Sequence, residues 1–382
     1  MVSKKEERFT SKYSLIVTAC FFLLIGGLSI AAVLMPDTEL SKEERRHYAS
    51  APKLTWDTVV SGKYMTELED YLLDQFVGRD WLRTVKTEVE TMLFGKADAN
   101  GYVLYEDGLY QLDADWKEAN VTRTAKEFAK MQAEWFADAD VYYALIPDKS
   151  YFLPADKYPV AGDAWVIAQM AEHLTDAAYI DLYPYLEIAD YYRTDLHWKQ
   201  EAVTDVAGAL LDGMAEKEQV GSTAGVGLES GYTVETVTET FFGGYAGASA
   251  FNVKPDVLCA LTDDAIVQTV VYDYEKKQDV AVYAPEKIDG MDPYDYYLWG
   301  ARALLTMKNP TCQNGKKLIM FRDSFGSSMA PLLLEGYEEI TLVDLRYVSA
   351  DYLPQMIDMS EYDDVLFLYS QRVLRHSDSM KF

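Results

Sequence analysis

The chain is poor in histidine and cysteine, with four histidines and three cysteines among its 382 residues. Because no Cys-x-x-Cys pair is present and no two histidines lie within one helical turn, we expect neither a metal site nor a cofactor. Cys20 lies in an apolar segment, so Cys259 and Cys312 either pair or remain buried thiols. A domain of this size does not need a disulfide for stability, which favours unpaired thiols.

Basic charge is also scarce. The chain has 35 lysines and arginines against 62 aspartates and glutamates, for a formal net charge of −27. This balance argues against nucleic acid as a partner and against general adhesion to anionic surfaces. No cluster of basic residues is present to bind a polyanion. If the substrate is a glycan, a neutral one therefore approaches the protein more easily than a charged one.

An uncharged apolar run covers residues 15–35 and is long enough to cross a bilayer. Basic residues precede it within 4–12, whereas the basic residues that follow it are accompanied by acidic ones. This asymmetry predicts a single-pass cell-membrane protein with a cytoplasmic N-terminus and an extracytoplasmic main domain. Residues 29–31 have the pattern of a signal-peptide cleavage site, but the apolar run continues beyond them, which favours an uncleaved anchor.

Three regions follow from these patterns: a cytoplasmic tail and transmembrane anchor at 1–35, a stalk and helical segment at 36–99, and a main domain at 100–382. Within the second region, apolar residues at 63–94 have helical spacing that is interrupted at Gly78. We therefore expect two helices broken at this glycine, and we interpret them as a scaffold that packs on the main domain rather than as carriers of chemistry.

The main domain alternates short β-rich runs with amphipathic helical patterns, which predicts an α/β fold with a mostly parallel sheet. Such sheets place functional sites at the carboxyl ends of their strands. The expected hairpin is at 101–110, the expected helices are at 121–136, 201–216 and 327–334, and further strands are expected at 141–146, 179–182, 266–274, 339–343 and 364–368.

A short apolar run at 317–321 ends just before Ser324, and small, helix-compatible residues follow. The run predicts a buried strand that delivers Ser324 to a turn before a helix. Free backbone N–H groups at a helix N-terminus favour developing negative charge, so this is a suitable place for an acyl-transfer nucleophile. A simple helix N-cap is the alternative interpretation of this serine.

Asp195 and His197 are two residues apart, and an extended segment would place both side chains on one side. An aspartate in this position can fix the tautomer of the histidine while the other ring nitrogen faces a hydroxyl. The other histidines lack this setting: His47 lies in a charged stretch, His173 in an expected helix and His376 near the C-terminus.

The Asp-Leu-His-Trp segment at 195–198 and the Arg-Asp-Ser-Phe segment at 322–325 together resemble the DHHW proteins and the related alginate O-acetyltransferase-like proteins. These are membrane-associated members of the SGNH hydrolase superfamily. Similar segments also occur at 69–80, 147–149 and 343–347. The resemblance implies a three-layer SGNH-hydrolase-like domain with Ser324 as nucleophile, His197 as base and Asp195 as its partner.

The resemblance also implies an activity and partners. It predicts an O-acetyltransferase that acts on an exported or cell-wall polysaccharide, with a membrane-bound O-acyltransferase partner that carries acetyl groups outward. A carbohydrate esterase, or deacetylase, would use the same chemistry with water as acceptor. A non-catalytic glycan-binding or assembly protein is the third reading, because Arg322 stands where the superfamily has glycine, Ala301 where relatives tend to have asparagine, and Leu196 where the family has a histidine.

Two stretches are rich in aromatic residues. Gly243 and Gly244 lie between aromatic side chains, where backbone can approach a ligand closely, so either glycine is a candidate oxyanion donor beside the N–H of Ser324. A tight turn is the alternative. The stretch at 283–299 contains several tyrosines, which suit either stacking against sugar rings or packing in the core.

Overall fold

The computed structural model describes residues 4–113, 115–158, 162–216 and 231–382. The chain forms two compact units, Met1–Gly95 and Lys96–Phe382, and each is described by itself below.

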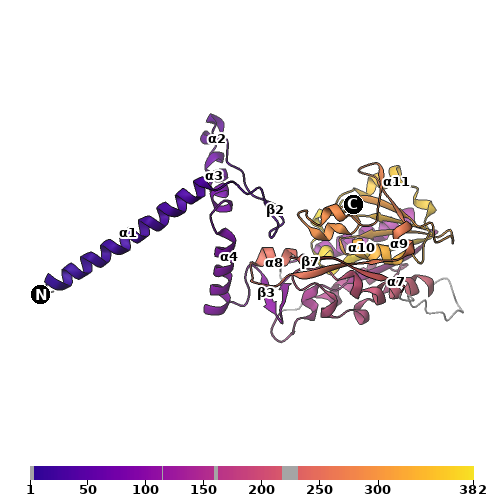
Figure 1. Ribbon diagram of the computed structural model, residues 1–382. Helices are drawn as coiled ribbons and strands as arrows, with labels where there is room; N and C mark the ends of the chain where they lie inside the picture. Colours follow the sequence, from indigo (N-terminus) through magenta and orange to yellow (C-terminus); the bar gives the residue numbers. More distant parts are fainter. Residues whose placement is uncertain (1–3, 114, 159–161, 217–230) are drawn as a thin grey trace. The chain divides into compact units, whose positions relative to one another are not determined.

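The first unit begins with α1 (Lys4–Leu34), which is one continuous helix (Figure 1). Its segment Tyr13–Ala32 is long enough and apolar enough to cross a membrane. A membrane anchor and a signal sequence both have these properties. The predicted hydrophobic helix is therefore present, at the expected place in the chain.

Short elements follow α1 in this unit: β1 (Leu40–Ser41), β2 (Arg46–His47), α2 (Trp56–Val60), α3 (Lys63–Asp74), α4 (Arg79–Glu88) and a π-helical turn (Val89–Leu93). The predicted helix break is confirmed, because α3 ends before Gly78 and α4 begins directly after it. Gly78 has a φ of 74°, a left-handed conformation that side chains other than glycine rarely adopt.

The second unit is built on an eight-stranded sheet with the order β10-β9-β11-β13-β12-β14-β5-β6. Its strands are β5 (Asp140–Ile146), β6 (Ala178–Ile180), β9 (Val270–Asp273), β10 (Gln278–Val280), β11 (Leu304–Lys308), β12 (Lys317–Arg322), β13 (Glu339–Val343) and β14 (Asp364–Ser370). The strands from β13 to β6 in this order run parallel, while β11, β9 and β10 form an antiparallel edge. The predicted mostly parallel sheet is confirmed.

Strand β12 is buried on both faces. Leu318 and Met320 pack into one hydrophobic cluster, and Ile319 and Phe321 pack into the other. Residues alternate between the two faces of a strand, so a strand covered on both sides has an unbroken apolar run. This explains why the sequence at 317–321 has no polar alternation.

Helices cover both faces of the sheet and make three layers. The cluster on one face includes residues of α7 (Thr204–Glu216) and α10 (Phe325–Met329), and the cluster on the other includes residues of α5 (Glu118–Trp135) and α6 (Asp163–His173). Figure 1 shows α7 along the edge of this unit. The remaining helices are α8 (Gly244–Ser249), α9 (Asp264–Gln268), α11 (Leu353–Met356) and α12 (Gln371–Arg375).

Two hairpins complete the second unit: β3 (Tyr102–Tyr105) with β4 (Gly108–Gln111), as predicted, and β7 (Thr233–Phe241) with β8 (Asp256–Thr262). The predicted strand at 266–274 is half wrong, because its first residues belong to α9. The side chain of Asp263 accepts a hydrogen bond from the N–H of Ile266 (2.7 Å) and caps that helix. Cys259 and Cys312 are unpaired, as predicted.

Candidate active site

Ser324 follows β12 directly and begins the turn into α10. The preceding carboxylate, Asp323, accepts hydrogen bonds from the N–H of Phe325 (3.0 Å) and from the N–H (2.8 Å) and hydroxyl (2.7 Å) of Ser370. Ser370 is the last residue of β14, which pairs with β12. Asp323 therefore ties two neighbouring strand ends together and holds Ser324 at the carboxyl edge of the sheet, where the serine is half-buried.

Asp195 and His197 lie in a closed turn rather than in the extended segment that we expected. Tyr191 and Trp198 form an isolated antiparallel bridge, and the N–H of Tyr192 donates to the C=O of His197 (3.0 Å). Within the turn, the N–H of His197 donates to Oδ1 of Asp195 (3.1 Å). The turn brings the two side chains together by these hydrogen bonds and not by strand alternation.

The structure brings the three predicted side chains into one hydrogen-bonded line. Nδ1 of His197 lies 2.6 Å from Oδ1 of Asp195, and Nε2 of His197 lies 2.8 Å from Oγ of Ser324. Asp195 is fully buried and His197 is 4% exposed. This geometry suits a neutral imidazole that donates from Nδ1 to the carboxylate and accepts from the serine hydroxyl at Nε2.

The backbone N–H groups of the glycine pair contact the turn that carries Asp195. The N–H of Gly244 donates to Oδ2 of Asp195 (2.8 Å), and the N–H of Gly243 donates to Oγ1 of Thr194 (2.8 Å). Both donors therefore have partners within the turn, which fits the alternative interpretation of this pair as a tight turn, and the oxyanion role stays an untested prediction. Gly244 holds the second carboxylate oxygen of Asp195, and Gly243 holds the hydroxyl of Thr194.

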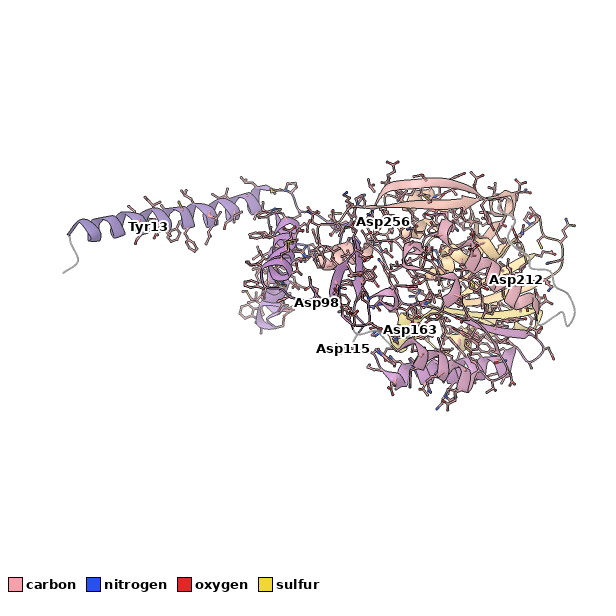
Figure 2. All side chains as sticks on the ribbon, turned by 90° about the horizontal axis from the view of Figure 1, so that it is seen from below. Tyr13, Asp98, Asp115, Asp163, Asp212 and Asp256 are labelled. Carbon is pink, nitrogen blue, oxygen red and sulfur yellow. The ribbon has the colours of Figure 1, made fainter. Side chains whose placement is uncertain are left out.

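A second carboxylate fixes the turn from the side of β8. Asp256, labelled in Figure 2, accepts hydrogen bonds from the N–H (2.8 Å) and hydroxyl (2.6 Å) of Thr194 and from the N–H (3.1 Å) and Nε (3.2 Å) of Arg193. Asp256 is almost fully buried. The two residues that precede Asp195 are thus anchored to the first residue of β8, where hydrogen bonds to a charged acceptor are strong.

The imidazole of His197 has an aromatic support. It stacks on the ring of Tyr294, with ring centroids 3.9 Å apart and an angle of 9° between the ring planes. Its centroid also lies 4.8 Å from the ring centroid of Phe325. The hydroxyl of Tyr294 hydrogen-bonds with that of Ser328 (2.8 Å), and burial raises the pKa of Tyr294 well above its ordinary value. The tyrosine therefore stays neutral and fixes the plane of the imidazole.

The tyrosines of the stretch at 283–299 pack in the core. Tyr294, Tyr296 and Tyr297 are buried, and they form a hydrophobic cluster with Phe241 and residues of β8. Of the two readings of this stretch, core packing is the correct one, and sugar stacking by these tyrosines is not supported.

Arg322, at the position where the sequence resemblance leads us to expect a glycine, does not contact the hydroxyl of Ser324 in the hydrogen bonds of the described residues. It is fully buried, and one of its terminal nitrogens donates to Oγ of Ser327 (3.0 Å) and lies 3.8 Å from Asp344. Asp344 pairs more closely with Arg346, at 2.9 and 2.6 Å. The side chain of Arg322 packs against Gly326, where an added Cβ would approach it to 2.7 Å. Ala301 is exposed and has no side-chain donor for an oxyanion.

The sequence alone did not single out Asp256, Tyr294 or Lys149 as supports of the site. Lys149 carried a weak signal, because it lies in one of the segments that resemble the family and directly follows a predicted strand. Tyr294 was one of several tyrosines in its stretch. Asp256 carried no signal, since its partners lie more than 60 positions away, at separations of 62 and 63 residues.

Comparison with protein-family models and with curated proteins gives no match to this chain. Solved structures do match. A DHHW family protein from Eubacterium siraeum DSM 15702 superposes with a TM-score of 0.59 and 22% identity over 74% of this chain and 94% of that chain. Bacillus cereus PatB1 superposes with a TM-score of 0.57 and 18% identity over 74% of this chain and 99% of its own. A second PatB1 structure, which carries a sulfonyl adduct, gives the same TM-score and identity.

The superpositions cover nearly the full length of these proteins, at identities that show the fold alone. They agree with the resemblance that the Asp-Leu-His-Trp and Arg-Asp-Ser-Phe segments indicated. The chain thus shares the α/β fold of a DHHW family protein and of Bacillus cereus PatB1.

Proposed function

We propose that the protein is a membrane-anchored extracytoplasmic acyltransferase with Ser324, His197 and Asp195 as its catalytic triad. The single observation that carries this proposal is the hydrogen-bonded line from the buried carboxylate through the imidazole to the half-buried hydroxyl. A serine hydroxyl is a weak nucleophile until an adjacent base accepts its proton, and the base must itself be oriented by a third group. The three side chains meet both requirements.

In this mechanism, the oxygen of Ser324 attacks the acyl carbonyl while Nε2 of His197 accepts the hydroxyl proton. Asp195 holds Nδ1–H and stabilises the imidazolium that forms. Collapse of the tetrahedral intermediate expels the donor alcohol, which takes the proton from His197 and leaves an acyl-serine. An acceptor hydroxyl then attacks the acyl-serine with the same histidine as base, and the serine recovers its proton.

The oxyanion of the intermediate requires hydrogen-bond donors. We assign one of these to the backbone N–H of Ser324, for which the described residues provide no acceptor. We do not assign a second donor to Gly243 or Gly244, because their N–H groups hold Thr194 and Asp195. Removal of one oxyanion donor in other enzymes costs about 10²–10³ in kcat, so this contact is a substantial part of the proposed catalysis.

The substrates follow from the family resemblance and from charge. The resemblance to alginate O-acetyltransferase-like proteins points to an acetyl group and to a hydroxyl of an exported or cell-wall polysaccharide. The net charge of −27 favours a neutral acceptor over a polyanion. Because acyl-CoA is not available outside the cell, a membrane-bound O-acyltransferase would supply the acetyl group, and α1 would keep the enzyme at the membrane with its N-terminus in the cytoplasm.

The triad is tested with the full-length protein in detergent and p-nitrophenyl acetate as donor. Ser324→Ala and His197→Ala should each abolish the acyl-enzyme burst without loss of folding. Matched controls are Ser379→Ala, an exposed serine, and His173→Ala, on α6, which should keep the wild-type burst. An aryl sulfonyl fluoride should label the wild type at Ser324. Turnover in both triad variants equal to that of the wild type would refute the triad.

Transfer and hydrolysis share the acyl-enzyme and differ in the acceptor. A transferase must exclude water near the acyl-serine, so its turnover should rise when a neutral oligosaccharide is added, and the acetylated sugar should accumulate. Release of acetate alone at all acceptor concentrations would make the protein an esterase. An absence of both burst and sulfonyl labelling in the wild type would favour a non-catalytic glycan-binding role.

A further inference from the structure

The turn that carries Asp195 is folded around a buried cation. Nζ of Lys149 donates to the backbone C=O groups of Tyr192 (2.5 Å), Arg193 (2.9 Å) and Asp195 (3.2 Å). An ammonium has three N–H groups, so all of its donors are used by this one turn. The side chain of Lys149 is 2% exposed.

The position of Lys149 follows from the end of β5. The strand ends at Ile146, and Asp148 then accepts hydrogen bonds from the N–H (2.8 Å) and hydroxyl (2.6 Å) of Ser150, which starts a short 3₁₀ turn. This cap turns Lys149 inward at the carboxyl edge of the sheet, the edge at which Ser324 also lies. The ammonium then lies over the ring faces of Tyr110 (5.1 Å) and Tyr245 (5.8 Å), which attract a cation.

Charged groups on several elements face this lysine. The carboxylates of Asp148, Asp195 and Asp256 favour its charged form, whereas Lys199 disfavours it. Burial outweighs the carboxylates and lowers the pKa of Lys149 to about 7. Lys149 is therefore a buried amine that interacts with three carboxylates. Its carbonyl partners belong to the backbone of the proposed catalytic turn.

We propose that Lys149 is a positioning residue for the proposed acyl transfer, which sets the backbone of the turn at 192–197 and thereby aligns Asp195 with His197. The inference rests on the proposed function of Ser324. Lys149 touches no reacting atom. Its three carbonyl contacts fix where the Cα of Asp195 lies, while Gly244 and the N–H of His197 fix the carboxylate itself. Loss of the cation removes one donor from each of the three carbonyls, of which that of Arg193 still accepts the N–H of Leu109 (2.8 Å), and this loss favours a rearranged turn.

The test compares Lys149→Met with Lys199→Met in the full-length protein. Methionine keeps the length and apolar contacts of lysine but donates no hydrogen bond. Lys199 is the matched control, since it is also a lysine, lies two residues beyond His197, and donates to the C=O of Ala189 (2.6 Å) rather than to the turn. We expect Lys149→Met to lower kcat for acylation at least tenfold with KM unchanged, and Lys199→Met to leave both constants within twofold of wild type.

A spectroscopic readout separates alignment from general damage. The proton between Nδ1 of His197 and Asp195 should give a far-downfield NMR resonance, because the 2.6 Å contact is short. This resonance should shift or broaden in Lys149→Met and stay unchanged in Lys199→Met. Wild-type kcat together with an unshifted resonance in Lys149→Met would overturn the proposal.

If Lys149→Met does not fold, the wild type itself provides the test. As the pH rises through about 7, Nζ of Lys149 should lose its proton, and the resonance of the Asp195–His197 proton should move over the same range. A constant resonance while Nζ titrates would overturn the proposal. Failure of the proposed function is distinguishable, because it would appear as an unchanged burst in Ser324→Ala, whatever the behaviour of Lys149.

Discussion

Gly243 lies directly against Asp195, so close that a Cβ added to the glycine would overlap the Cβ of the aspartate and the backbone carbonyl of Thr194. This contact is what allows the glycine pair to donate both of its N–H groups to the turn. The lack of a side chain at Gly243 therefore leaves room for Asp195 in the position from which its carboxylate contacts His197.

The first prediction concerns this contact. Gly243→Ala should lower the free energy of unfolding by about 1–3 kcal/mol, because overpacking displaces the turn, and should reduce the acylation rate at least tenfold. Gly208→Ala in α7 is the matched control, since a Cβ there meets no atom within 4 Å. Chemical denaturation and burst kinetics measure both effects. A fully active, stable Gly243→Ala protein would show that the turn tolerates displacement.

The second prediction concerns Asp256. Asp256→Asn keeps the shape of the side chain but replaces one carboxylate oxygen by an NH₂ group. This donor then faces either the donors of Thr194 or the donors of Arg193. We expect a loss of about 1–3 kcal/mol in the free energy of unfolding, with slower acylation, because the turn loses its anchor on β8. Asp279→Asn, at an exposed position on β10, should change neither quantity. Equal effects of the two substitutions would contradict the assigned role.

The third prediction compares the partly buried Arg346 with the fully buried Arg322. Arg346 makes the close pair with Asp344, so Arg346→Met should cost about 3–5 kcal/mol by leaving a buried carboxylate without its partner. Arg322→Met should cost less than Arg346→Met, because Arg322 lies 3.8 Å from Asp344 and two of its nitrogens make no hydrogen bond. It should also retain acylation. A larger loss for Arg322→Met would reverse this ranking.

The fourth prediction concerns pH. Burial lowers the pKa of Lys149 from 10.5 to about 7, so between these values the unfolded chain binds the proton that the folded chain has released. This group therefore makes the free energy of unfolding rise with pH over that interval. Acylation should fall near pH 7, where the folded protein releases this proton, because a neutral amine donates fewer hydrogen bonds to the turn.

Denaturation and burst kinetics at several pH values, each compared with Lys149→Met, isolate the contribution of this lysine. The variant lacks the titrating group. As the pH rises, the free energy of unfolding of the wild type should therefore increase relative to that of the variant, while the acylation rate of the wild type should decrease relative to that of the variant. Parallel trends, or a difference that does not vary with pH, would show that Lys149 does not titrate in this range.

Local patterns in the sequence were sufficient for most of the elements and for the choice of the three residues that we propose as the triad. The unbroken apolar run before Ser324 predicted β12, the spacing interrupted at Gly78 predicted the helix break, and the two motifs marked Asp195 and His197. The strand expected at 266–274 failed at its start, because a side-chain cap by Asp263 outweighed the β-branched residues that follow it.

The sequence by itself thus determined the membrane-length helix, the parallel α/β sheet and the three residues proposed for chemistry. Only the tertiary structure decided what surrounds them: that Gly244 holds Asp195, that Tyr294 supports His197, and that the Asp195 turn closes on Lys149. The physical reason is that propensity and periodicity act over a few residues, whereas a backbone N–H or a buried ammonium finds its partner only when distant segments pack together.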